Sequence, residues 1–534
     1  MFSIVSRCIE CGAKSSPCDF SAIPGTPHHA LLNSNDVPLE SDAAIVKSTI
    51  SRTDQHLAWL DREIARLSEQ LKQLEEERLR WSSYQAKNRG ILSPLRRVPT
   101  ELLCEIFGWT LTSARESESQ LARHPGFCET DSPWVLTHVS RTWREVSVSS
   151  PSLWSIVAVN FPNLDLSSSY PLAMIETHVA RAQNLRVIFR GSDAHHAPNQ
   201  IEIFRYLAKH ASRWQELRID LAGSLYPLLD SLRGCVPLLC RVWIRCPGHI
   251  PSPEAQSFDF LNTASSLVDT AFYNPPSDFS FHPPSHLTRY ELEATLTIHR
   301  DLVALAPHLV EAHVYVTDNE ESWPRSHEII GLSLLRRLYV SNGGFLQYIR
   351  APALEELGLH ISTASRLHLE SFLMRSSCTL QCLCLPDCAD FSPYDFNVQE
   401  TLAVLNNISS LVEFRVNISH SAHQVNVLLA GLAVSDARTR VVAPQLSCIS
   451  FTPEPWLLIP FDYGAYTKMI KSRWDSPECA LTRTELCTSA DPGLAPFGSL
   501  QLLRENGLQF MLRTGSEATR ITSRWMCTYT FDSY

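Results

Sequence analysis

Ten short segments with one shared spacing of apolar residues constrain the fold of this 534-residue chain more than any other feature. In the pattern, an apolar residue is followed three and five positions later by further residues of mainly apolar character. The segments start at Trp214, Leu239, Leu267, Leu287, Leu309, Leu335, Leu354, Leu380, Leu411 and Leu446. Successive starts lie between 19 residues (335 to 354) and 35 residues (411 to 446) apart. Such recurrence predicts a series of short strands, one in each repeated unit.

This spacing is typical of the strand in leucine-rich repeats. For residues 161–455 the sequence therefore predicts an α/β fold, an irregular leucine-rich-repeat solenoid in which short parallel strands alternate with helices. The asparagine turn of such repeats is not recognisable, so the repeats would be degenerate. A generic α/β domain with several aliphatic strands is the alternative. Residues 456–534 fit the succession poorly and are expected to form a C-terminal cap of uncertain structure.

In a solenoid, the strand residues between the inward apolar positions would face the concave surface. Trp, Tyr and Arg are the residue types that carry most binding energy at protein interfaces. Our candidates for contact with a protein target are Arg241, Trp243, Tyr315 and Tyr339. The same surface is expected to hold Arg218, Asp220, Arg289, Glu291, His313, Arg337, Glu413 and Arg415.

Charge and composition limit the partners. The chain has 46 basic and 56 acidic residues, a net charge of -10, which argues against nucleic-acid binding because phosphates require a basic face. No run of 18 apolar residues predicts a membrane span, and the first residues lack the apolar core of a secretory signal. The 16 cysteines are scattered singly, as in a reducing compartment. We expect a protein of the cytoplasm, the nucleus or both.

The amino-terminal part contains a heptad pattern. Residues 1–40 are polar and aperiodic and are expected to form a disordered tail, whereas residues 41–89 predict one long amphipathic helix. Its two apolar rows are Ile50, Leu57, Ile64 and Leu71, and Leu60, Leu67, Leu74 and Trp81. One interpretation is a homodimeric parallel coiled coil, which the flanking acids Asp61, Glu63, Glu75 and Glu77 disfavour. The favoured interpretation is a helix that lies on its own protein or on a partner helix.

Residues 91–160 predict two short amphipathic helices separated by a polar insert at 112–131. Thr100 is a plausible N-cap of the first helix, whose apolar face would hold Leu102, Leu103, Ile106 and Phe107. Ser132 and Pro133 suit the start of the second helix. Its buried stripe is expected to be Trp134, Leu136, Val139, Trp143 and Val146.

These residues resemble the F-box family. The resemblance rests on the stretches Leu95-Arg-Arg-Val98-Pro99-Thr-Glu-Leu102-Leu103-Cys-Glu-Ile106-Phe107, Leu136-Thr-His-Val139-Ser-Arg-Thr-Trp143-Arg144-Glu145 and Ser150-Pro151-Ser-Leu153-Trp154. Val98 replaces the usual leucine, and the insert is longer than the usual link. The upstream helix and irregular repeats are similar to a type expanded in mushroom-forming (basidiomycete) fungi.

The resemblance implies docking onto a Skp-type adaptor and, through it, onto a cullin ubiquitin ligase. The implied adaptor contacts are Leu95, Val98, Pro99, Leu102, Leu103, Ile106, Phe107, Trp134, Val139 and Trp143. We therefore expect a substrate-receptor subunit that brings an unknown protein target to the ligase. A ligase-independent repeat scaffold with a vestigial F-box is the alternative.

Catalytic and metal motifs are weak in this sequence. It contains no G-x-x-x-x-G-K-[ST], H-E-x-x-H or G-x-S-x-G motif, so we expect no enzyme activity and no cofactor. Cys8, Cys11 and Cys18 fall one ligand short of a closed zinc site, unless His28 or His29 joins them. The group Cys378, Cys382, Cys384 and Cys388 is better explained by packing, and we predict no metal site there.

Overall fold

The chain folds into two compact units, residues 1–99 and 100–534. The computed structural model describes residues 27–111, 132–161, 172–193, 199–246, 258–276, 279–317, 329–359, 361, 363–385, 397–418, 422–434, 441–453, 461–488, 491–493, 495–515, 517–518 and 521–522. The predicted insert at 112–131 and the cysteines Cys8, Cys11, Cys18 and Cys388 lie outside these residues.

The first unit is dominated by the predicted long helix, which is confirmed as α2 (Glu40–Ile91), a single helix of 52 residues. No proline interrupts it, and its only glycine, Gly90, stands next to its end. The short helix α1 (Pro27–Leu32) packs beside α2, so part of the predicted tail is helical. The turn η1 (Pro94–Arg97) follows α2. Within the part of the chain described, no helix combines the length and apolar character needed to cross a membrane.

The second unit begins with small helices: α3 (Thr100–Thr110), α5 (Leu136–Val139), α6 (Arg141–Ser149) and the turn η2 (Pro151–Trp154). The sequence predicts one continuous helix after Pro133, and that prediction is wrong. The chain is extended at Ser140, whose hydroxyl oxygen accepts a hydrogen bond from the Trp143 amide at 3.2 Å. Ser140 thereby caps a new helix, because a serine side chain competes for the amides of a first turn.

A parallel sheet forms the rest of the second unit. Among the described residues it has 14 strands, each paired with its neighbours in chain order. The strands are β1 (Ile156–Asn160), β2 (Leu185–Arg190), β3 (Trp214–Asp220), β4 (Arg241–Arg245), β5 (Asp269–Tyr273), β6 (Arg289–Ala294), β7 (Glu311–Val316), β9 (Arg337–Val340), β11 (Glu356–Leu359), β12 (Cys382–Leu385), β13 (Glu413–Ile418), β14 (Cys448–Pro453), β15 (Arg483–Thr488) and β16 (Gln509–Thr514). The short strands β8 (Ile330–Gly331) and β10 (Ile349–Arg350) pair separately.

The ten predicted segments are confirmed as strands, from β3 to β14. Their fourth positions align in one row across the sheet, so the sequence spacing also gave the register. The row runs Leu217, Val242, Thr270, Tyr290, Ala312, Leu338, Leu357, Leu383, Phe414 and Ile449. These side chains are all buried, because the helices pack over this face of the sheet.

The succession continues on both sides of the predicted segments. Strands β1 and β2 precede them, and β15 and β16 extend the same sheet beyond Pro455, where the sequence predicts a C-terminal cap of uncertain structure. The expected end near Pro455 is therefore wrong. In β15 the inward position is held by a polar residue, Thr484. Its hydroxyl is hydrogen-bonded to the Tyr466 hydroxyl at 2.7 Å and to the carbonyl of Ile449 at 3.0 Å, which removes the cost of burying it.

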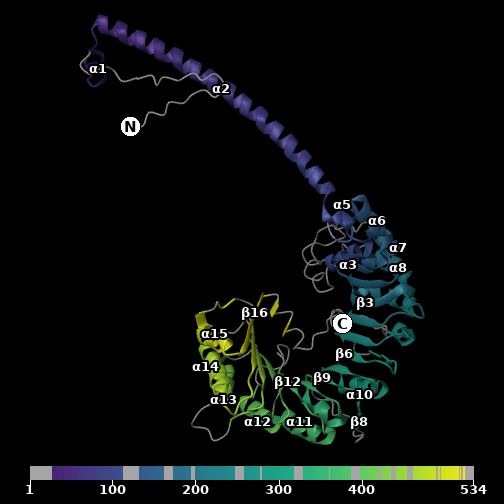
Figure 1. Ribbon diagram of the computed structural model, residues 1–534. Coiled ribbons are helices and arrows are strands. Elements are labelled where there is room, and N and C mark those ends of the chain that lie inside the picture. The colour runs from purple at the N-terminus through teal and green to yellow at the C-terminus, as the bar shows by residue number, and fades with distance from the viewer. Residues whose placement is uncertain are drawn as a thin grey trace. The chain divides into compact units, whose positions relative to one another are not determined.

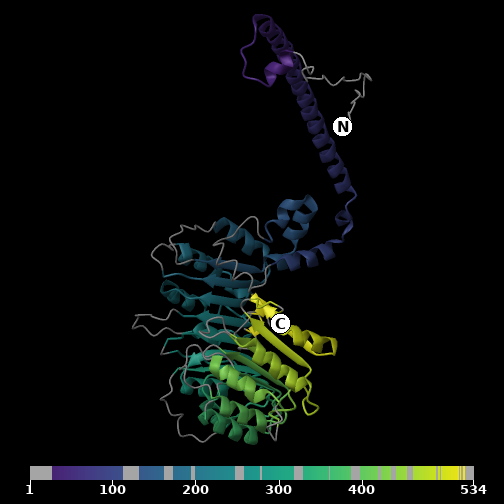
Figure 2. The ribbon, with the colours of Figure 1, turned by 90° about the vertical axis from the view of Figure 1, so that its left-hand side faces the viewer.

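Helices follow most of the strands. They are α7 (Leu172–Arg181), α8 (Asn199–Ala208), α9 (Tyr226–Leu229), α10 (Leu296–Leu305), α11 (Thr363–Ser376), α12 (Val398–Asn407), α13 (Ala422–Leu432), α14 (Tyr463–Trp474) and α15 (Gly498–Glu505). Figure 1 and Figure 2 show the strands stacked in a bent row with these helices along its outer side. The predicted alternation of parallel strands and helices is confirmed.

Candidate functional site

The helix α3 has a buried face and an exposed apolar face. Leu103 and Phe107 are buried, and the Phe107 ring lies 4.7 Å from that of Trp143. Leu102 and Ile106 point away from this core and are 55% and 38% exposed. The sequence places all four residues on one apolar face of the helix. In the structure two of them are buried in the core and two are exposed at the surface. Of these four residues, Leu102 and Ile106 can therefore contact a partner without the module unfolding.

The second helical segment places its predicted contacts in different surroundings. Trp134 and Trp143 are half-buried, whereas Val139 is 55% exposed and is not part of the buried stripe predicted for it. The break at Ser140 explains this difference, because it ends α5 directly after Val139. Leu136 and Val146 are buried as predicted.

Trp109 and Val135 are exposed apolar residues that do not belong to the predicted contacts. Trp109 is 81% exposed and stands three residues after Ile106 and seven after Leu102, so the three form one stripe along α3. Val135, just before α5, is also exposed. The i, i+4, i+7 spacing was available in the sequence as a signal for Trp109. We call Leu102, Ile106, Trp109, Val135 and Val139 the exposed apolar set.

A cluster of aromatic rings joins the helical module to the first repeat. The ring centres of Trp134 and Trp154 lie 5.1 Å apart in an edge-to-face contact. The ring centre of His178, on α7, lies 5.1 Å from that of Trp154. The Arg181 guanidinium lies 4.4 Å from the centre of the Trp154 ring, a cation–π contact. The Trp154 indole N–H donates to the Ser147 carbonyl at 2.7 Å. Burial lowers the pKa of His178 to about 4, so this histidine is neutral near pH 7.

The remaining predicted adaptor contacts lie in the first unit. Leu95 is exposed in η1, Val98 is half-buried, and Pro99 is exposed. The Ser93 hydroxyl caps η1 by accepting from the Leu95 amide.

The opposite face of the sheet carries a row of alternating charges. Neighbouring strands place basic and acidic residues side by side in strict alternation. We call this series the charge row: Arg186, Glu216, Arg241, Asp269, Arg289, Glu311, Arg337 and Glu356. Arg186 and Arg241 both contact the Glu216 carboxylate, at 2.7 and 2.9 Å.

The charge row is most deeply buried at Asp269 of β5 and Arg289 of β6. Arg289 contacts Glu311 at 2.8 Å and Asp269 at 3.4 Å. His313 lies between Glu311, at 2.8 Å, and the fully buried Glu291, at 3.3 Å. The Tyr273 hydroxyl donates to Glu291. A buried ionic cluster is stable only when its members are paired in this way.

Burial and pairing act on the pKa values of this cluster in opposite directions. Burial raises the pKa of Asp269 to about 6, and the charge of Arg289 offsets only part of that rise. Burial also disfavours the charge of Glu311, but His313 and Arg289 outweigh it and lower the Glu311 pKa. For His313 burial lowers the pKa, yet hydrogen bonds to Glu291 and Glu311 leave it above its ordinary value.

The four predicted target contacts do not form one exposed group. Trp243 and Tyr339 are each 3% exposed, so their expected exposure is wrong. Trp243 is covered by the guanidinium groups of Arg218 and Arg245, at 4.4 and 4.8 Å. The Tyr339 ring packs 4.9 Å from that of the half-buried Tyr315.

Arg241, the fourth predicted target contact, lies on the same face of the sheet. Arg241 is half-buried in the charge row, where it contacts Glu216. Alternation assigned each of these residues to the correct face but could not show that this face is packed as well. Arg245 and Arg337 remain largely exposed there, with side chains 52% and 62% accessible.

The cysteines of β12 pack within the protein. Cys382 and Cys384 are buried, and burial raises the pKa of Cys384 to about 12 and that of Cys382 further, so both thiols stay protonated. Cys384 packs with Cys487, Ala518 and Ile521. Among the described residues, no three His, Cys, Asp or Glu side chains are grouped to hold a metal ion.

The fold defines a repetitive α/β protein whose parallel strands follow one another in chain order, preceded by a helical module with an exposed apolar set. No family model and no curated protein matches the chain. Among solved structures, the crystal structure of the TLR13–ssRNA13 complex aligns with 62% of this chain at 13% identity, with a TM-score of 0.29. The alignment covers 45% of that chain, so this chain spans less than half of its length.

Proposed function

We propose that the chain is an F-box substrate receptor, whose helical module binds a Skp-type adaptor and whose leucine-rich-repeat-like domain binds a protein target for a cullin ubiquitin ligase. The single observation that supports this proposal most is the division of α3 into two faces. Leu103 and Phe107 hold the helix in place, while Leu102, Ile106 and Trp109 remain exposed.

An exposed apolar stripe of this kind favours a protein partner. Three large apolar side chains in one line on a helix are costly in water, and covering them removes apolar area worth about 25 cal/mol per Å². Val139 adds a fourth apolar surface in the same module. The resemblance of this stretch to the F-box family names the adaptor as the partner that would cover it.

For the target we propose the face that carries the charge row. Trp243 and Tyr339 support this face from inside, whereas Arg245, Arg337 and Tyr315 present atoms to solvent. Arginine and tyrosine combine apolar area with hydrogen-bond donors, which suits a protein surface. The ligase contribution would be proximity, which raises the effective concentration of the target lysine.

The test is co-purification of the full-length protein with a recombinant Skp-type adaptor. The test variant carries Leu102→Asp and Ile106→Asp, and we expect it to bind at least about 100-fold more weakly, since each charge would be buried unpaired in the interface. The control carries Met374→Asp and Leu502→Asp, which alter two exposed apolar residues on α11 and α15, 77% and 62% accessible.

Both variants must keep the thermal midpoint of the parent protein, because all four residues are exposed. Adaptor binding by the parent and the control but not by the test variant supports the proposal. If the parent does not bind the adaptor, or if the test variant binds as well as the control, the module is vestigial and the chain is a ligase-independent scaffold.

A further inference from the structure

The helix α2 exposes a continuous apolar seam. Its length of 52 residues corresponds to about 78 Å at 1.5 Å per residue. None of its residues is buried. We call the following residues the seam, all of them between 37% and 64% exposed: Ile50, Leu57, Leu60, Ile64, Leu67, Leu71, Leu74 and Trp81.

We propose that the seam pairs with the seam of a second copy of this chain, in a parallel, in-register, two-stranded coiled coil. Position a of the heptad holds Ile50 and Ile64 in alternation with Leu57 and Leu71, while Leu60, Leu67 and Leu74 occupy position d. A β-branched residue at a with leucine at d favours a parallel pair of helices. The seam covers more than four heptads, enough for a stable interface.

The flanking charges fit a parallel pair when they are matched position by position. In such a pair, each g residue faces the e residue five positions later in the other helix. This places His56 opposite Asp61, Glu63 opposite Ser68, Gln70 opposite Glu75, and Glu77 opposite Ser82. No pair sets acid against acid, and one pair can be attractive. The acids on both sides of the seam therefore do not exclude a dimer.

An antiparallel pair is disfavoured by the same residues. It would join e positions with e positions, and between Ile50 and Tyr84 these hold only Asp54, Asp61, Ser68, Glu75 and Ser82. Acids would meet acids or serines there, and no ion pair could form. The parallel arrangement avoids this repulsion.

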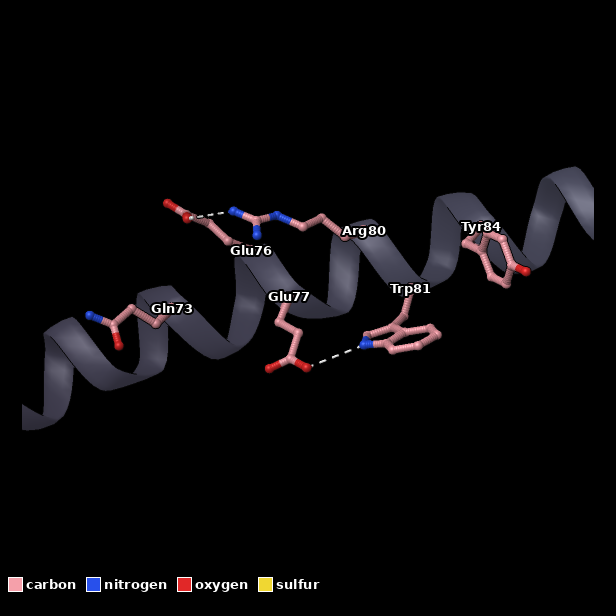
Figure 3. Close-up of a pocket in the computed structure, with 6 residues that line it drawn as sticks. All are labelled: Gln73, Glu76, Glu77, Arg80, Trp81 and Tyr84. Atoms are coloured by element: carbon pink, nitrogen blue, oxygen red, sulfur yellow. Dashed lines mark hydrogen bonds and ion pairs between the residues drawn. The ribbon is translucent and has the colours of Figure 1, made fainter.

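Polar side chains flank the carboxyl-terminal end of the seam. Figure 3 shows Glu77 and Trp81 on the same side of α2, where the indole N–H donates to the carboxylate at 3.2 Å. Arg80 and Glu76 pair on the other side at 3.8 Å. Arg78 occupies the next a position, where its charge would lie beside Glu77 of the second copy. One polar residue at an a position fixes register and strand number.

The test uses the full-length protein, and it does not depend on adaptor binding. Light scattering at micromolar concentration should give twice the mass of one chain for the parent. Leu67→Asp should give the mass of one chain, because two aspartates would face each other inside the seam. The matched control is Leu79→Asp, the same change at an exposed leucine in position b of the same helix, and it should remain dimeric.

The direction of the helices is tested by cross-linking. Leu74→Cys should form a disulfide between copies under mild oxidation, since in a parallel pair position d meets its own counterpart. Leu79→Cys should not do so, and the exposed Cys235 is present in both variants as an internal control. A monomeric parent, a dimeric Leu67→Asp variant, or no cross-link at Leu74→Cys in a dimeric protein would each overturn the proposal.

Discussion

Arg289 is the residue on which the buried part of the charge row depends. Its guanidinium forms ion pairs with Asp269 and Glu311, and it lies 3.8 Å from the Glu291 carboxylate. In the sheet interior these carboxylates cannot be solvated as they are in water. One cation therefore neutralises part of the charge of three acids.

We expect Arg289→Met to lower the free energy of unfolding by about 3–5 kcal/mol, because it leaves uncompensated charge in a buried site. The deficit should shrink as the pH falls, since the acids of the variant then become neutral. Urea denaturation at pH 7.5 and pH 5.5 measures both effects. A companion variant with Asp269→Asn added should recover part of the loss, and an unchanged unfolding midpoint for Arg289→Met would contradict this account.

His313 and His299 should give stability profiles of opposite sign with pH. The raised pKa of His313 means that its proton stabilises the fold fully below about pH 6.5, the value expected when unfolded, and less as the pH rises through the folded value. Burial lowers the pKa of His299 to about 4, so the fold loses stability as the pH falls from about 6.5 towards 4.

The deficit of His313→Gln relative to the parent should therefore be largest near pH 5 and decrease at higher pH. By contrast, His299→Gln should improve relative to the parent as the pH falls below 6.5. Thermal midpoints measured from pH 4.5 to 8 check both trends. Parallel profiles for the two variants would show that neither histidine titrates as the structure indicates.

At the scale of single elements, the sequence predicted which segments form strands better than it predicted which side chains are exposed. All ten segments with the L-x-x-L-x-L spacing are strands, because one row of side chains must fill the layer below the helices. In β2, Leu185 stands two residues rather than three before Val187, so the segment does not match the pattern and its register with β3 shifts after Leu185. In β15, Thr484 takes the apolar place and is satisfied by Tyr466, which no local pattern reveals.

The sequence predicted on which face of its helix or strand each candidate residue lies, but not whether its side chain is exposed. Helical spacing put Leu102 and Leu103 on one apolar half of α3, yet only packing against Trp143 and its neighbours decides which of them is covered. Likewise, alternation placed Trp243 correctly, but the arginines that cover it belong to two different strands. Such contacts depend on register across the sheet, which a single segment does not contain.

The last repeat should stabilise the repeats that precede it. Deletion of residues 495–534 removes α15 and β16, leaves β15 as an unpaired edge, and uncovers apolar side chains of α14. We expect a lower thermal midpoint and association of the truncated chain, measured by calorimetry and light scattering. A monodisperse truncated protein with the parent midpoint would instead fit a separate cap.

At the scale of the whole molecule, the two units should separate under limited proteolysis. Arg96 and Arg97 are both exposed and lie between α2 and α3, outside any α-helix. We expect brief trypsin treatment to release a stable fragment that begins near Val98 and keeps the thermal midpoint of the second unit. Mass spectrometry identifies the cut. Rapid degradation of that fragment would show that it does not fold independently.

The alternation of the charge row sets a parity rule for the length of the chain. Removal of residues 241–268 would bring Glu216 next to Asp269, acid against acid. Removal of residues 241–288 would bring Glu216 next to Arg289 and restore attraction, although it deletes more of the protein. The larger deletion should therefore melt at the higher temperature. A molecule built in this way can gain or lose strands between β2 and β11 most easily two at a time.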